Sequence, residues 1–243
     1  MSSYFQKLLR DSGKFLAEQH NAFVRIAELP QLEGRYSYGL AYNGAEAIVD
    51  KSFYRERPAY ALYGNNHTTG HIIQDRRGTL DIRELTHWRY DTINDLPTVS
   101  AREEKIRMHY EIDYEATCIA LTLLRDAHEA GYLKIDDEDF YNVLVPAMIA
   151  HYRHDVSLHI GTLENGEPPV FGTDITQTPC HPWVAERDLI IYDKPIEVLP
   201  VKRMDLPLVF HVHRASQDFL PITENMDMKL RRAAQKAYGG KTL

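Results

Sequence analysis

Apolar residues in the middle of the chain recur at helical spacing over two long stretches. The first stretch opens with Ser100 and Glu103, the reciprocal capping pair of a helix start, and Gly131 stands where a helix closes in a left-handed residue. Winding the residues between them at about 100° per residue gives one apolar and one charged face. The pattern predicts a helix from about Ala101 to Ala130.

The second stretch begins after a short turn. Asp136 with Asp139 three places on is a helix-capping pattern, and the apolar stripe continues to about His159. Pro146 lacks an amide and crowds the preceding turn, so we expect a local disturbance there. Because the connection is short, the two helices are predicted to be antiparallel neighbours, forming a hairpin at about 100–160 that is the core of the fold.

Five polar residues fall on the apolar faces of this hairpin. They are His109 and Asp113 on the first helix, and His151, His154 and Asp155 on the second. An ionised carboxylate in an apolar interface costs several kcal/mol unless it is paired, hydrogen-bonded or bound to a cation. The cluster therefore requires a partner for its charges.

Two interpretations of the cluster stay open. In the first, these side chains bind a divalent metal such as Zn, Fe or Mn, Thr117 lies behind the ligands, and the metal serves hydrolysis or oxygen chemistry. In the second, they are buried pairs that fix the helix register or meet another subunit. Counting outward from the turn places Asp113 level with His154 and Asp155.

Before the hairpin, capping residues and helical periodicity predict a first helix from Ser3 to a stop at Pro30. Short runs of Tyr, Ile, Val and Phe then predict strands, with 36–42 and 59–63 as the best candidates. Residues 64–78 are interpreted as a polar loop, whose His67 and His71 could reach a common ligand but are expected to be solvated. A short helix is expected at 81–91.

After the hairpin, a long ordered loop is expected at 161–182, because the segment is rich in Gly, Pro and Thr. Strands are predicted at 189–192, 196–199 and 208–213, and a basic helix at 223–238. His211 and His213 share a strand face, and cross-strand packing or surface exposure is their expected role.

The order of these elements predicts a single α+β domain over residues 1–243. A mainly antiparallel sheet would pack against the long central antiparallel helical hairpin and the terminal helices, since predicted strands cluster instead of alternating with helices.

Composition narrows the functional classes. A net charge of −7 opposes broad nucleic-acid binding, which needs clustered Lys and Arg. Two cysteines exclude a disulfide framework, and we find no apolar run of the length that spans a bilayer. We therefore expect a cytoplasmic protein, or one incorporated into an assembly built in the cytoplasm, with no membrane partner.

Two functional hypotheses follow. One is a structural or adaptor subunit of a larger assembly, such as a virion or a secretion particle, whose partners are copies of itself or other proteins. The 15 tyrosines, a residue type enriched at interfaces, and the helices predicted at both ends support it. The alternative is a metal-dependent hydrolase or oxygenase with its His/Asp site on the hairpin. The sequence leaves open whether the protein is an enzyme.

Overall fold

The computed structural model describes residues 2–27, 37–42, 46–79, 96–165, 179–201 and 209–212. Its helices are α1 (Ser2–His20), α2 (Lys51–Glu56), α3 (Pro58–Arg77), α6 (Val99–Glu129), α7 (Asp137–Asp139), α8 (Val145–Asn165) and α9 (Pro182–Ala185). A π-helical turn, η1 (Phe140–Leu144), precedes α8. Its strands are β1 (Phe23–Ala27), β2 (Ser37–Tyr42), β3 (Glu46–Asp50) and β4 (Val209–Val212).

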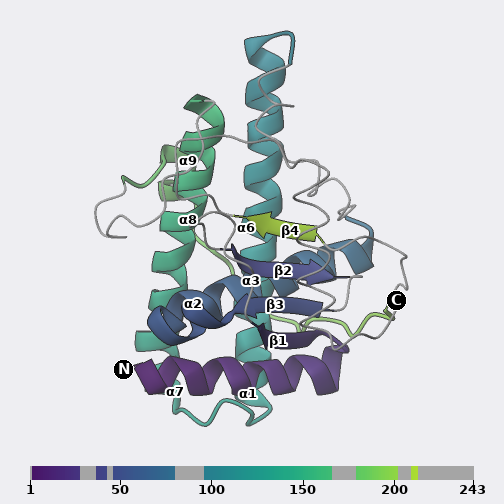
Figure 1. The fold of residues 1–243 in the computed structure, drawn as a ribbon, viewed down its shortest axis with the longest axis vertical. Coiled ribbons are helices and arrows are strands. Elements are labelled where there is room, and N and C mark those ends of the chain that lie inside the picture. Colours follow the sequence, from purple (N-terminus) through teal and green to yellow (C-terminus); the bar gives the residue numbers. More distant parts are fainter. Residues whose placement is uncertain are drawn as a thin grey trace.

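The two long helices of the hairpin are confirmed. They are α6 and α8, which run side by side along the longest axis of the molecule (Figure 1). Asp136 accepts the Asp139 amide at 2.8 Å and caps α7, which continues through η1 into α8, and Gly131 is left-handed with φ of 76°. The first helix starts two residues earlier than predicted, because Thr98 and not Ser100 is its cap.

The predicted α+β class with a mainly antiparallel sheet is wrong. The described residues are mostly helical. The strands are short, in the order β1-β3-β2-β4; β1 pairs with β3 in parallel, and β2 pairs with β3 and β4 antiparallel. The reason is that three segments predicted as strands are not strands in the structure. Residues 59–63 belong to α3, and 189–192 and 196–199 lie in a segment without regular secondary structure, part of which bonds to helix side chains.

Helix α3 is the central element of the fold. It contacts α1, α6, α8, β2 and β3, and Figure 1 shows it behind the strands. Every residue from Tyr60 to Arg76 is buried, so α3 has no polar face of the kind that reveals a surface helix. Its Gly, Asn and Thr residues have low helix propensity, which is why the sequence suggested a strand and a loop.

Polar side chains inside α3 bond to their own helix. Asn66, Thr68 and Thr69 each donate to the carbonyl four residues earlier, at 2.8, 2.7 and 3.0 Å. These bonds satisfy groups that would otherwise be costly to bury. The helix then ends in the usual way, at Gly78 in the left-handed conformation.

Gly70 sets the distance between α3 and α6. A Cβ built on Gly70 would overlap the carbonyl of Ala116, so the two backbones touch at this point. Only a glycine allows that approach, and it brings the neighbouring residues of both helices within side-chain reach of one another.

The segment 183–196 begins within the short helix α9, continues without regular secondary structure and lies along α6, whose side chains bond its backbone. The stripe on α6 consists of every fourth residue: Tyr110, Tyr114, Cys118, Thr122 and Asp126. These side chains bond the backbone of Trp183, Asp188, Ile190, Tyr192 and Ile196 in that order. We call 183–196 the strap. Its pairing with α6 explains why the strands predicted at 189–192 and 196–199 are absent from the described structure.

The remaining predicted elements are in part confirmed, in part changed in their bounds and in part outside the described residues. The first helix ends at His20 and not near Pro30, because Asn21 is left-handed and β1 follows. Helix α8 continues to Asn165, so the first five residues of the loop predicted at 161–182 are helical, and residues 166–178 lie outside the described part of the chain. The predicted strands at 36–42 and 208–213 correspond to β2 and β4. The helices expected at 81–91 and 223–238, and His213, lie outside the described residues.

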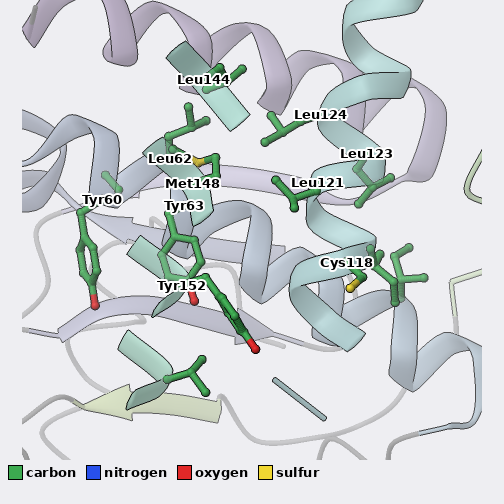
Figure 2. Close-up of a cluster of buried hydrophobic side chains, with 14 of the residues drawn as sticks. Tyr60, Leu62, Tyr63, Cys118, Leu121, Leu123, Leu124, Leu144, Met148 and Tyr152 are labelled. Atoms are coloured by element: carbon green, nitrogen blue, oxygen red, sulfur yellow. The ribbon is translucent and has the colours of Figure 1, made fainter. Parts of the chain in front are cut away.

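Apolar packing between α3, α6 and α8 forms the interior. Figure 2 shows Leu62, Leu121 and Met148 within one cluster, and the hydroxyls of Tyr63 and Tyr152 point the same way. None of the helices in the described ranges is long and apolar enough to cross a bilayer.

We predict that Gly70→Ala lowers the free energy of unfolding by about 1–3 kcal/mol, since the added methyl group must displace the Ala116 carbonyl. Gly161→Ala on α8 is the control, because its Cβ would meet nothing within 4 Å and should stabilise the helix by up to about 1 kcal/mol. Urea unfolding measures both. Equal midpoints for the two variants would refute the close helix contact.

We also predict that Thr122→Val lowers the free energy of unfolding by about 1–3 kcal/mol, because the Tyr192 amide loses the hydroxyl that accepts it at 3.0 Å. Thr122→Ser keeps that hydroxyl and should remain close to the parent. Hydrogen exchange at the Tyr192 amide locates the effect. If the two variants unfold alike, the strap is not held by this bond.

Candidate metal centre

Three buried side chains from two helices converge on one point. His67 and His71 lie one turn apart on α3, and Asp113 faces them from α6. The Nε2 atoms of the two histidines are 3.1 Å apart, and Asp113 Oδ1 is 3.6 Å from His67 Nε2 and 3.4 Å from His71 Nε2. The close approach at Gly70, the residue before His71, makes this convergence possible.

The hydrogen bonds around His71 fix which ring nitrogen carries its proton. Gln74 donates both amide hydrogens, to the Ile112 carbonyl at 3.0 Å and to Glu115 Oε2 at 2.7 Å. Its Oε1 is therefore turned toward His71 Nδ1, 2.9 Å away, and must accept a proton from it. In the neutral ring, Nε2 then carries a lone pair.

The same reasoning applies to His67. Thr117 uses its one hydroxyl proton to donate to the Asp113 carbonyl at 2.8 Å. Its oxygen therefore accepts from His67 Nδ1 at 3.0 Å, which again leaves the lone pair on Nε2. Thr117 thus lies behind His67, whereas the metal interpretation of the sequence placed it behind ligands of the hairpin.

The cluster consequently directs three lone-pair atoms toward one another, two imidazole nitrogens and a carboxylate oxygen. Such an arrangement is repulsive unless a positive charge lies between them. Burial, followed by the neighbouring His67, lowers the pKa of His71 despite Asp113, so this ring resists taking up a proton. A metal cation satisfies all three groups at once.

The distances fit a small tetrahedral ion. Ligand atoms about 2.0–2.1 Å from a tetrahedral zinc are separated from one another by about 3.3–3.4 Å. The three observed separations, 3.1, 3.4 and 3.6 Å, lie around that value. Two histidines and one carboxylate are also a ligand set of catalytic zinc sites.

The second oxygen of Asp113 has a different partner. His159 on α8 donates from Nδ1 to Asp113 Oδ2 at 3.2 Å. Burial raises the pKa of Asp113, but the hydrogen bond from His159 holds it well below its usual value. Burial likewise lowers the pKa of His159, and the bond to Asp113 outweighs that effect and raises it. The two groups form a part-buried ion pair, in which 27% of the His159 side-chain surface is exposed.

His109 packs behind this pair. Its ring lies edge-on to His159 with centroids 6.5 Å apart. Burial, followed by the charge of His159, lowers the pKa of His109 to about 2, so this ring is neutral at pH 7. Of the five residues predicted from sequence, Asp113 is thus in the cluster and His109 is beside its ion-pair partner.

The other three predicted residues lie against α3 outside the metal cluster. Asp155 accepts hydrogen bonds from Tyr60 at 2.7 Å and Tyr63 at 3.3 Å. His151 packs on the same two tyrosine rings, with centroids 5.3 and 6.1 Å away. Burial lowers the pKa of His151 to about 4 and also lowers that of His154. Among the described residues these three do not form a group that could bind a metal.

The register predicted for the hairpin was off by about one turn. Asp113 meets His159 and not His154 or Asp155. The π-helical turn η1 adds about one residue to this path, which accounts for part of the shift. It ends two residues before Pro146, near where a disturbance was expected.

The sequence analysis considered His67 and His71 but placed them on a solvated loop, and it gave no role to His159. The available signal was the spacing of His67 and His71, four residues apart, which puts two side chains on one face of a helix. The glycines, asparagines and threonines around them concealed the helix.

Comparisons of the chain with protein-family models, with curated proteins and with solved structures found no match. The functional argument therefore rests on the geometry of the cluster.

We predict that His151→Phe reduces the loss of stability between pH 6.5 and pH 4. The folded protein leaves His151 neutral down to about pH 4, whereas the unfolded chain protonates it near 6.5, so acid favours unfolding across that window. Phenylalanine keeps the ring packing against Tyr60 and Tyr63. Urea unfolding at pH 7, 5.5 and 4.5 checks this, and parallel curves for parent and variant would contradict it.

Proposed function

We propose that this protein is a zinc-dependent hydrolase whose metal is bound by His67, His71 and Asp113. The observation that carries the proposal is the convergence of three buried lone-pair atoms, whose hydrogen-bond partners fix both histidines with Nε2 toward the shared point. Three protein ligands among the described residues is the number used by catalytic zinc sites, which keep a fourth position for water or substrate.

The chemistry follows from the charge of the ion. A zinc ion lowers the pKa of a bound water from 15.7 to about 7 and so supplies a nucleophilic hydroxide at neutral pH. It also polarises the oxygen of a carbonyl or phosphoryl group that approaches the open position. Within the chain, His67, His71 and Asp113 orient the metal, and α8 covers the opposite side of Asp113.

Thr68 distinguishes this centre from the common helix-borne zinc peptidases. In their motif, two histidines at the same spacing flank a glutamate that acts as general base. Here Thr68 follows the first histidine, and its hydroxyl donates to the Gly64 carbonyl at 2.7 Å. The activation of water is therefore assigned to the metal and not to a carboxylate at that position.

Zinc fits better than the other metals considered. The separations of the ligand atoms suit a tetrahedral ion, and an octahedral face built with bonds of about 2.1 Å would bring them to about 3.0 Å. Mixed nitrogen and oxygen ligands with no thiolate also suit iron and manganese, so all three are included in the test.

We predict that protein purified without metal-affinity tags contains about one zinc per chain, and that His71→Leu and Asp113→Asn lose it while remaining folded. Elemental analysis and circular dichroism measure the two properties. His181→Gln is the matched control, because that histidine pairs with Glu164 away from the cluster. Retention of metal by both cluster variants would refute the site.

Activity is tested separately on the metal-loaded protein with chromogenic carboxylic and phosphoric esters. We expect hydrolysis that a chelator abolishes and that added zinc restores. A protein that binds zinc at this cluster but hydrolyses neither ester class would limit the proposal to metal binding. Iron in place of zinc, with oxygen consumption, would favour the oxygenase alternative.

We further propose that the protein works in the cytoplasm. The cysteines Cys118 and Cys180 are both free, as expected in a reducing compartment. The hypothesis of a structural or adaptor subunit in an assembly, with protein partners, stays a prediction.

A further inference from the structure

The two oxygens of Asp113 face different partners. Oδ1 points at the paired histidines of α3, while Oδ2 accepts from His159 Nδ1 at 3.2 Å. A free carboxylate can bind a metal through one oxygen or through both. Because Oδ2 accepts the hydrogen bond from His159, Asp113 is left with Oδ1 alone for a metal.

We infer that His159 is a positioning residue that restricts Asp113 to a single metal-binding oxygen and thereby sets the coordination number of the centre. This inference rests on the proposed metal site. His159 contacts Asp113 through Oδ2, whereas Oδ1 of the same carboxylate faces His67 and His71.

Packing holds His159 in the orientation that this role requires. Its ring lies at 65° to that of His109, one turn before Asp113 on α6. His109 is buried, with 2% of its surface exposed, and provides a fixed wall beside His159. The direction of the Nδ1–H bond is thus determined by the packing of α8 against α6.

This arrangement makes α8 a part of the metal centre. The ligands come from α3 and α6, but the orientation of the third ligand is set by a residue near the end of α8. Removing a residue that hydrogen-bonds a metal ligand commonly weakens metal binding by about ten- to a hundredfold. The same size of effect is expected here.

The experiment compares zinc affinity in four full-length proteins: the parent, His159→Leu, His159→Asn and His154→Leu. A chromophoric chelator competes for the metal, and cobalt is substituted for zinc to record its visible spectrum. Asparagine carries an amide hydrogen donor at the place of the histidine Nδ1, so it should rescue the bond to Asp113. His154 is also buried on α8, and it controls for the loss of a histidine from that helix.

We expect His159→Leu to bind zinc about ten- to a hundredfold more weakly and to show a weaker cobalt band, because a two-oxygen Asp113 raises the coordination number. His159→Asn and His154→Leu should stay within about threefold of the parent. Parent-like binding by His159→Leu overturns the inference, as does an Asn variant as weak as the Leu variant. A parent protein that binds no zinc overturns the proposed function instead.

Discussion

The contact between the backbones of α3 and α6 at Gly70 and Ala116 is the constraint on which the rest of the structure depends. The residues next to this contact are those of the candidate centre, His71 after Gly70 and Thr117 after Ala116. Asp113 lies one turn earlier on α6. At an ordinary helix separation of about 8–10 Å between axes, larger side chains would fill the space between these groups. The glycine brings the ligands together.

A helix buried on all sides must satisfy its polar groups without water. In α3 many of these groups bond within the helix, to carbonyls four residues earlier, or across to α6 through Gln74 and His67, while the side-chain amide of Asn65 has no hydrogen-bond partner among the described residues. The same bonds that allow burial also fix the ring orientation of the two histidines. Stability and the geometry of the centre therefore have a common cause.

The sequence predicted the hairpin well because α6 and α8 have clear capping residues and a strong apolar periodicity. It also identified Asp113 as a buried carboxylate in need of a partner. It failed at α3, since helix propensity and amphipathic pattern carry no information about a helix that is buried on every side. It failed again for the strap, because apolar alternation indicates an extended chain but not what the backbone pairs with.

The strap has a consequence for how the sequence can change over evolution. Asp188 and Ile190 are held through backbone atoms, whereas Tyr114 and Cys118 on α6 contribute side chains to these bonds. Almost any residue has a backbone carbonyl and amide, but few residue types have a side-chain hydroxyl or thiol that reaches the strap from α6. Selection on this contact therefore acts on one partner. Tyr114 and Cys118 should diverge slowly, while Asp188 and Ile190, whose side chains are exposed, accept substitutions.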